Sequence, residues 1–388
     1  MQSHIIGWAH TRFGKLEDET LESLVTRVAA DAIADSGLDP AAIDEIVIGH
    51  FNQGMDPQGF PASLVLQADD ALRFKPATRV ENACATGSAA IRHAATAIAA
   101  GRARAVLVVG VEKMTAAPAA EVQRALVSAS HVREEGGAGA SFAGIFGRIA
   151  DLYFQRHGDR SDALAAIAAK NHRNGSLNPL AHMRKDVGFA FCNTVSDRNP
   201  LVAGPLRRTD CSMVSDGAAA LVLVHPDRAA GATKAVALRA QSQVNDFLPL
   251  SRRDIVRLEG CALAWAQALA AGGLGLADLD FVETHDCFTI AELIEYEAMG
   301  LTPPGQGHRA VAEGWTEIGG RLPVNPSGGL KAKGHPIGAT GVSMHVMAAM
   351  QLAGTPVGAV VPDAATAGIF NMGGAGVANY VSILERTR

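Results

Sequence analysis

Short runs of β-branched and other apolar residues recur along the chain and predict its strands. Within each run, apolar residues follow one another without the polar alternation that a half-exposed strand shows. Continuous runs of this kind are typical of sheets that are covered on both faces. The predicted strands occupy residues 5–6, 45–49, 105–110, 220–224 and 235–238.

Helical patterns lie between these strands. Between Leu21 and Ala32, apolar residues return at intervals of three and four, which predicts a helix with one buried face. Thr20 is the predicted cap at its start, and Gly37 marks its end. Residues 89–100 are apolar almost all round, so we expect a fully buried helix there. Strands that alternate with helices favour an α/β fold built in layers.

A second series of elements begins after residue 245 and follows a similar order. It comprises a helix, a strand, two further helices and a hairpin at 254–271, 280–286, 291 onward, 342–352 and 367–384. The similar order suggests an internal duplication. The segment in between fits neither half and is predicted to be an inserted, mainly helical lobe that offers substrate-binding surface. The predicted domains are an N-terminal half (1–115 and 191–245), an inserted loop domain (116–190) and a C-terminal half (246–388).

Composition narrows the class of protein. The 388 residues carry a formal net charge of −5, which gives no reason to expect binding to nucleic acid or to an anionic membrane. No apolar run reaches the roughly 18 to 20 residues that span a bilayer, and the N-terminus lacks the layout of a secretory signal. The five cysteines are odd in number, widely spaced and free of a C-x-x-C pattern. We therefore expect a reducing, cytoplasmic location without a disulfide framework or a structural metal.

Two segments far apart in the chain carry the clearest chemistry. Cys84 lies just before a predicted buried helix, where unpaired N–H groups and the helix dipole are expected to lower the pKa of a thiol and to hold an oxyanion. His335 lies in a loop with glycines at 328, 329, 334, 338 and 341, and glycines let the backbone approach another group closely. Because a cysteine nucleophile needs a base, the pair predicts covalent thiol catalysis.

Four segments, matching in order and spacing, together resemble the thiolase superfamily, and the resemblance covers essentially the whole chain. They are residues 81–90 around Cys84, 215–220, 325–329 and 334–336. The resemblance implies a thiolase fold, with two similar βαβαβ-type halves stacked as α-β-α-β-α layers and a loop domain inserted between them. It also implies acyl-CoA and acetyl-CoA as substrates, no permanently bound cofactor or metal, and a homodimer or homotetramer.

The resemblance also assigns roles to single residues. Cys84 would carry the acyl group, and His335 would activate it and help bind the thioester oxygen. The N–H groups of Cys84 and of Gly373 would form a second oxyanion site. Ser327 and Gly328, from the Asn-Pro-Ser-Gly-Gly motif, are expected on the substrate side of the site.

The chain departs from common thiolases at two places. Where full-reaction thiolases carry Cys-x-Gly-Gly-Gly, this chain has Asn371 followed by Met-Gly-Gly-Ala-Gly. An amide cannot act as a base, so Asn371 is expected to bind substrate only. The second departure, His285-Asp-Cys287-Phe288, is similar to the sterol-carrier-protein-2-type thiolases, in which this cysteine is thought to replace the missing acid/base. Cys287 would then transfer the proton while His285 orients a water or the substrate oxygen; the alternative, that Cys287 only packs beneath the site, stays open.

We therefore expect a thiolase-type acyltransferase that forms an acyl-enzyme on Cys84. The acyl group would pass to CoA in thiolysis of a 3-oxoacyl-CoA, or to acetyl-CoA in a Claisen condensation. Three alternatives stay open: transfer to a non-CoA acceptor, a ketoacyl-synthase-like condensing enzyme, and a non-catalytic acyl-CoA or lipid-binding protein or a subunit that needs a partner protein.

Other reactive side chains receive a structural interpretation. Cys192, Cys211 and Cys261 are expected in the core. Lys331 and Lys333 are expected either to contact phosphates or to be solvated. The histidines at 50, 172, 182 and 308 are expected at the surface or in local hydrogen bonds. An apolar stripe at residues 142–152 is expected to pack against the body of the protein, with the wall of an acyl pocket as the alternative.

Overall fold

The computed structural model describes residues 2–137 and 139–387, and a large mixed sheet forms its frame. The strand order in this sheet is β3-β2-β4-β7-β1-β8-β11-β10-β9. Its strands are β1 (Ser3–His10), β2 (Glu45–Gly49), β3 (Ala77–Val80), β4 (Ala105–Glu112), β7 (Gly217–Val224), β8 (Val236–Asn245), β9 (Phe281–Glu283), β10 (Thr366–Gly373) and β11 (Ala378–Arg386). A separate small sheet pairs β5 (Leu201–Ala203) with β6 (Leu206–Arg207).

The sheet consists of two halves that repeat one strand pattern. In the N-terminal half, β3, β2 and β4 run parallel, and β7 and β1 follow in antiparallel pairing. In the C-terminal half, β9 and β10 run parallel, and β11 and β8 follow in antiparallel pairing. A single parallel bridge from Val324 to Val282 takes the place of β3. This repetition is the internal duplication that the order of elements suggests.

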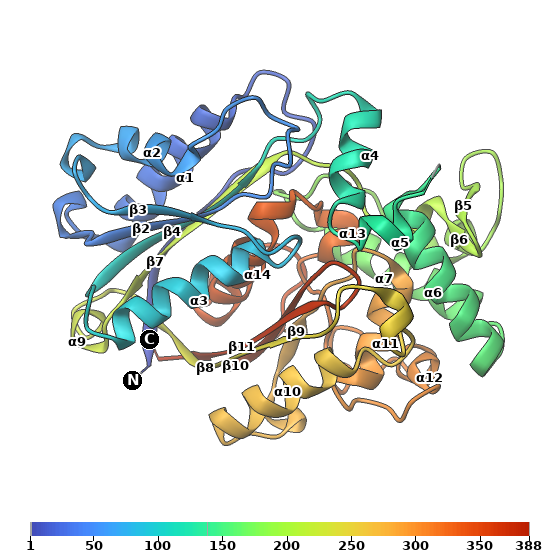
Figure 1. Ribbon diagram of the computed structural model, residues 1–388. Helices are drawn as coiled ribbons and strands as arrows, with labels where there is room; N and C mark the ends of the chain where they lie inside the picture. The colour runs from blue at the N-terminus through green and yellow to red at the C-terminus, as the bar shows by residue number, and fades with distance from the viewer. Residues whose placement is uncertain (1, 138, 388) are drawn as a thin grey trace.

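Helices cover both faces of each half-sheet. Figure 1 shows α3 (Thr86–Ala99) and α14 (Ile337–Leu352) between the two halves, with α1 (Leu21–Ser36) and α2 (Pro61–Leu64) outside the first half and α10 (Glu259–Gly272) outside the second. The result is the stack of α-β-α-β-α layers that the resemblance implies. The remaining helices of the body are α9 (Pro226–Ala229), α11 (Thr289–Ala298), α12 (Gly307–Ala312) and α13 (Gly329–Lys333).

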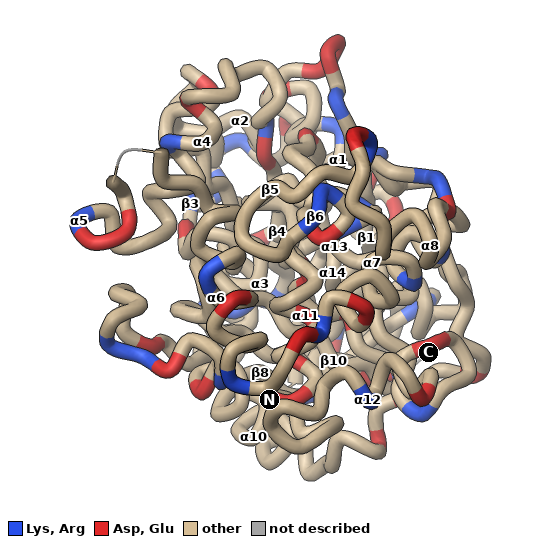
Figure 2. The backbone as a smooth tube through the Cα atoms, turned by 90° about the vertical axis from the view of Figure 1, so that its right-hand side faces the viewer, with Lys and Arg blue, Asp and Glu red and all other residues tan. Residues whose placement is uncertain are grey.

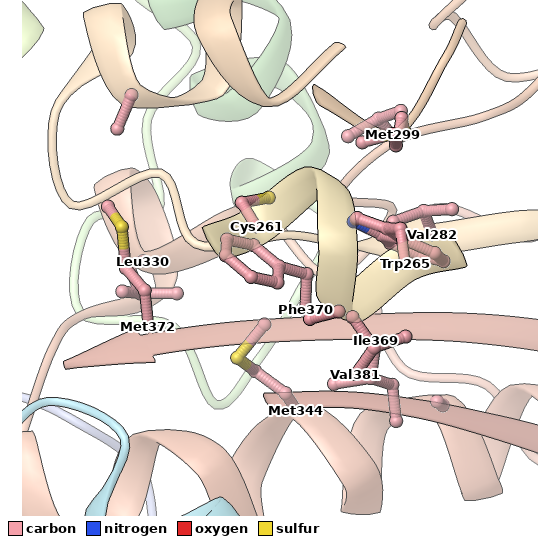
Figure 3. Packing of buried hydrophobic residues seen from close by; sticks show 14 of the residues in the cluster. Cys261, Trp265, Val282, Met299, Leu330, Met344, Ile369, Phe370, Met372 and Val381 are labelled. Carbon is pink, nitrogen blue, oxygen red and sulfur yellow. The ribbon is translucent and has the colours of Figure 1, made fainter. Parts of the chain in front are cut away.

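The local sequence explains these elements. Thr20 caps α1 by accepting from the backbone N–H of Ser23, and Gly37 ends the helix in the left-handed region at φ 70°, as predicted. The strands β4 and β7 are buried at every residue, which accounts for their continuous apolar runs. Figure 3 shows Trp265 of α10 and Phe370 of β10 among the tightly packed side chains of the C-terminal half, together with Cys261, which is fully buried as predicted.

The segment between β4 and β5 is helical and lies to one side of the layers, at the right of Figure 1. Its helices are α4 (Ala119–Val127), α5 (Val132–Glu135), α6 (Phe142–His157), α7 (Ser161–Ser176) and α8 (Gly188–Cys192). Downstream of this segment, β8 takes the place in the C-terminal half that β1 takes in the N-terminal half.

The charged residues are mixed in sign over the surface. In Figure 2, Lys and Arg positions alternate with Asp and Glu positions along the backbone, and the side in view has no continuous basic face. Among the described residues, no helix is both long enough and apolar enough to cross a membrane.

Candidate active site

Cys84 lies on a sharp turn between β3 and α3. The preceding Ala83 has a φ of 48°, a left-handed backbone that alanine rarely adopts. Ala85 follows as the N-cap of α3, and Cys84 is only 4% exposed. Strained backbone of this kind persists only where the surrounding structure fixes it, and it is found most often at functional sites. The turn presents the Cys84 side chain at the start of a buried helix.

His335 lies at the corresponding place before α14, the second of the two central helices. Its Nδ1 lies 2.7 Å from the Thr340 hydroxyl oxygen, and that hydroxyl donates to the backbone oxygen of Pro336 at 2.9 Å. With the Thr340 proton in this bond, we assign the imidazole proton of His335 to Nδ1, which then donates to Thr340. The Nε2 of His335 therefore keeps its lone pair, as a general base requires.

Burial decides the ionisation of this pair. Burial raises the pKa of the Cys84 thiol to about 12, even though the N–H groups of Gly374 and of Cys84 itself favour the thiolate. Burial likewise lowers the pKa of His335 to about 4, with Lys333 acting in the same direction and Glu112 against it. The expectation that the helix start lowers the thiol pKa is therefore wrong, because desolvation outweighs the N–H groups. At rest the pair is a neutral thiol beside a neutral imidazole.

His285 completes a cluster with these two residues. One ring nitrogen of each histidine and the Cys84 sulfur all lie within 4.8 Å of one another. The two histidine rings meet edge to face, with centroids 5.2 Å apart. His285 is fully buried, and its pKa lies well below the usual range because of burial and the neighbouring His335. Both rings are therefore neutral near pH 7.

Asn371, in β10, lies behind this cluster. Its amide nitrogen donates to the backbone oxygen of Cys84 at 3.0 Å and lies 2.9 Å from Nδ1 of His285. Its amide oxygen accepts from the Ser88 hydroxyl at 2.8 Å. Asn371 is fully buried and is not among the residues that line the cavity described below. Its contacts are with the nucleophile segment and with His285.

Cys287 lies at the cavity beside Cys84. It is 3% exposed, and burial first, then the neighbouring Cys84, raise its pKa well above the usual range. Its backbone oxygen accepts from the N–H of Ser212 at 2.9 Å. This hydrogen bond joins Cys287 to the loop that precedes β7. The structure thus brings together Cys84, His335, His285 and Cys287.

The other expected site residues lie differently. Besides the N–H of Cys84 itself, the N–H that faces the Cys84 sulfur belongs to Gly374, one residue after Gly373. Ser327 pairs with the buried Glu283 carboxylate through both its N–H and its hydroxyl, at 3.0 and 2.7 Å. Gly328 lies against the backbone of Gly175, where a Cβ would come within 2.5 Å. Neither Ser327 nor Gly328 lines the cavity at Cys84.

A mostly apolar cavity of about 200 Å³ opens onto the cluster. Cys84, Cys287 and His335 are among its lining residues, whereas His285 is not. Its remaining walls come from Met114, Gln123, Leu126, Phe142, Ala143, Val202, Cys211, Ser212, Met213, Val214, Phe288 and Ile337. The helical segment between β4 and β5 thus supplies part of the wall, through α4 and the start of α6. In the stripe at 142–152, Phe142 lines the cavity, whereas Phe146 stacks on Phe288 in the core with ring centroids 4.5 Å apart.

The sequence analysis does not assign two residues to the site. Cys211 packs against the core as expected but is only partly buried and also lines the cavity, whereas Cys192 is fully buried as expected. Glu112 was not singled out. Its carboxylate accepts from the backbone N–H groups of Phe51 at 3.0 Å, of Asn52 at 2.8 Å and of Gly338, in the first turn of α14, at 2.9 Å. The sequence contains one signal for Glu112: it is the acidic residue at the end of the buried strand β4.

Several polar residues expected at the surface are instead buried. Lys331 and Lys333 are 3% and 1% exposed, so the solvated interpretation is wrong for both. Lys331 lines a second hollow that also contacts Cys211 and Met213. His50 and His172 are also buried, because the former packs beside Glu112 and the latter lies on the buried face of α7.

Comparison with known proteins agrees with this geometry. Residues 3–227 match the family model of the thiolase N-terminal domain, and residues 242–386 match that of the thiolase C-terminal domain-like family. The chain is 36% identical to an acetyl-CoA acetyltransferase of Methanothermobacter thermautotrophicus, over 98% of this chain and 99% of that protein. It is 32% identical to sterol carrier protein 2 of Bos taurus, over 95% of this chain and 69% of that protein.

Solved structures show the same fold. A structure described as Ltp2-ChsH2(DUF35) aldolase aligns with a TM-score of 0.85 at 23% identity, covering 100% of this chain and 98% of that chain. The family matches extend over both halves of the sheet and include the Cys84 and His335 segments. The chain therefore belongs to the thiolase family and is an acyltransferase of the thiolase type.

Proposed function

We propose that this enzyme takes an acyl group from acyl-CoA onto Cys84 and passes it to a second CoA-linked substrate. That acceptor is CoA in the degradative direction and acetyl-CoA in the biosynthetic direction. The observation that carries the proposal is the convergence of the Cys84 sulfur with one nitrogen of His335 and one of His285 within 4.8 Å, with Cys84 and His335 lining an apolar cavity. The acetyl-CoA acetyltransferase relative supports this choice of substrates.

In the first half-reaction, Nε2 of His335 takes the thiol proton while the Cys84 sulfur attacks the thioester carbonyl. The negative charge that develops on the carbonyl oxygen is held by the N–H groups of Cys84 and Gly374, which already face the sulfur. When the tetrahedral intermediate collapses, the carbon–sulfur bond to CoA breaks. The CoA sulfur takes the proton from His335, and the acyl group remains on Cys84.

In the second half-reaction, acetyl-CoA must lose an α-proton before its carbon can attack the acyl-enzyme. Cys287 is the group that we assign to this step, because it lines the cavity and the Asn371 amide does not titrate near neutral pH and cannot act as a base. Since burial keeps the Cys287 thiol protonated at rest, it must first give its proton to Nε2 of His335, which is neutral again once CoA has left. The oxygen of the resulting enolate is held by N–H groups of His285 and of protonated His335.

The shape of the cavity favours a short acyl group. Its volume of about 200 Å³ lies below the roughly 300 to 1,000 Å³ of typical ligand pockets. Apolar walls and the buried position of Cys84 keep water away from the acyl-enzyme, so hydrolysis is suppressed.

Release of free CoA tests the proposal. The enzyme is mixed with acyl-CoAs of graded length, and the thiol released in the first turnover is measured. We expect one equivalent of CoA per active site with acetyl-CoA and less with long chains, and no release from Cys84→Ala. Cys211→Ala is the matched control, because Cys211 lines the same cavity. Release that continues in Cys84→Ala would contradict the proposal. Release that occurs without any CoA-linked product favours the second candidate, transfer to a non-CoA acceptor that brings its own nucleophile.

We also propose that two copies of the chain pair through β3. This strand is at the edge of the sheet, and unpaired strand edges invite pairing with another chain. Two large apolar side chains are exposed nearby. Phe74, just before β3, is 85% exposed, and Phe60, just before α2, is 78% exposed. Light scattering of the purified protein tests this: a dimer that Phe74→Glu converts to monomer supports it, and a wild-type monomer contradicts it.

A further inference from the structure

His285 has one ring nitrogen that nothing in the described chain satisfies. The residue is fully buried, and its Nε2 has no hydrogen-bond partner among the described residues. Its other nitrogen, Nδ1, lies 2.9 Å from the amide nitrogen of Asn371. Because an unpaired buried polar group is costly, the free Nε2 is expected to meet a ligand. Whether it meets that ligand as a donor or as an acceptor depends on which nitrogen carries the proton.

The surroundings of Asn371 fix the direction of its amide. The backbone oxygen of Cys84, 3.0 Å away, can only accept a hydrogen bond, so the amide nitrogen must face it. The Ser88 hydroxyl donates to the amide oxygen from the other side at 2.8 Å. A flipped amide would set two oxygens against each other at the Cys84 carbonyl. The second amide hydrogen then points at Nδ1 of His285, which must accept it.

We propose that Asn371 is a positioning residue that holds His285 in the tautomer protonated at Nε2. His285 then offers an N–H to the substrate oxygen, while Thr340 holds His335 in the opposite tautomer with a free lone pair. The two neighbouring imidazoles thus have complementary roles, donor and base. This inference rests on the proposed function for the identity of the oxygen that is bound, but the tautomer itself is a property of the free enzyme.

The inference also predicts that the cluster does not bind a metal ion. Cys84, His285 and His335 have the spacing of three metal ligands, and a Cys-His-His set suits zinc. A nitrogen that carries a proton cannot coordinate a metal. Asn371 therefore excludes the metal by the same hydrogen bond that prepares the donor.

Nitrogen-15 NMR of the free enzyme tests the tautomer directly. The His285 signals are assigned as those missing from His285→Gln, and we expect wild-type His285 to be protonated at Nε2 and His335 at Nδ1. In Asn371→Asp, the carboxylate accepts from Nδ1 of His285, so the proton moves there and Nε2 becomes free. A wild-type His285 protonated at Nδ1, or a tautomer unchanged in Asn371→Asp, would overturn the inference.

Cobalt binding gives a second readout, which a purely structural role would not move. With Co²⁺ as the probe, we expect no thiolate-to-cobalt absorption band in the wild type and a clear band in Asn371→Asp that Cys84→Ala abolishes. A wild type that binds Co²⁺ through Cys84 and His285 would contradict the inference. If the Asp variant does not fold, the wild-type NMR and Co²⁺ results still decide the matter.

Kinetics separate this inference from the proposed function. Loss of one donor to a developing oxyanion typically lowers kcat about 100-fold or more, so Asn371→Asp is expected to lose that much in turnover, while first-turnover CoA release changes less. If wild-type CoA release occurs but His285 is protonated at Nδ1, the tautomer inference fails and the proposed function stands. If the tautomer is as inferred but CoA is not released, the proposed function fails.

Discussion

Gly87 of α3 and Gly341 of α14 face each other with no room for a methyl group between them. A Cβ on Gly87 would lie 2.8 Å from the backbone nitrogen of Gly341, and a Cβ on Gly341 would lie 2.3 Å from the nitrogen of Ser88. The helix α3 begins two residues after Cys84, and α14 begins two residues after His335. The close contact of two equivalent helices in a duplicated fold therefore sets the spacing of nucleophile and base.

Substitution of Gly87 by alanine should push these helices apart. Overpacking a tight contact typically costs about 1–3 kcal/mol, so we expect the free energy of unfolding of Gly87→Ala to fall by about that amount. First-turnover CoA release should slow about 10-fold or more, because small displacements of reacting groups are costly. Urea unfolding and rapid mixing measure the two effects. Gly231→Ala is the control, since no atom lies within 4 Å of its Cβ position; equal behaviour of the two variants would refute the argument.

Removal of the Thr340 hydroxyl should weaken the base. In Thr340→Val, the Nδ1–H of His335 loses its buried acceptor, and an unsatisfied buried donor costs about 1–3 kcal/mol. We expect the first-turnover rate to fall about 10- to 100-fold, with little change in the KM for acyl-CoA. Thr340→Ser keeps the hydroxyl and should recover most of the rate. A serine variant as slow as the valine variant would show that the methyl group, and not the hydrogen bond, is what matters.

Much of the fold follows from the sequence because its signals are local. The cap and end of α1 and the buried strands β2, β4 and β7 need only neighbouring residues to be recognised. The sequence analysis does not predict the short, half-exposed β3, since its stability comes from pairing with β2 rather than from an apolar run. In the site, Cys84 and His335 stand out by their local context. Glu112 and Cys211 do not, because only the folded chain brings N–H groups of two distant segments to one carboxylate and turns one cysteine toward the cavity.

The direction of the Cys84 pKa shift likewise could not be predicted from the sequence. A helix start favours a thiolate, but the depth of burial that opposes it depends on α14 and on the helical segment at 119–192. The same holds for Lys331 and Lys333, whose burial comes from packing of α13 against α7.

The pH dependence of acylation should reflect a neutral pair. Because the pKa of His335 is about 4 and that of Cys84 about 12, the imidazole is unprotonated above the first value and the thiol keeps its proton below the second. We expect the first-turnover rate to be nearly constant from about pH 6 to about pH 9 and to fall below about pH 5, where His335 gains a proton. Ultraviolet absorbance detects the thiolate directly. A thiolate signal at neutral pH that Cys84→Ala removes would indicate an ion pair and contradict the prediction.

Cys287 should be needed only in the second half-reaction. We expect Cys287→Ala to exchange the α-protons of acetyl-CoA with deuterated water about 100-fold or more slowly than the wild type, as is typical when a general base is lost. First-turnover CoA release should stay within a few-fold of wild type, because His335 serves Cys84. Cys211→Ala, at the same cavity, is the control for simple changes of shape. Undiminished exchange in Cys287→Ala would show that Cys287 only packs beneath the site and does not transfer the proton.

The most direct test of the central claim is the mass of the protein after reaction with acetyl-CoA. Intact mass spectrometry of the wild type should show one added acetyl group, and peptide mapping should place it on Cys84. Cys84→Ala should gain nothing, and His335→Gln should gain the group much more slowly. No adduct on the folded wild type, or an adduct that persists in Cys84→Ala, would contradict the account.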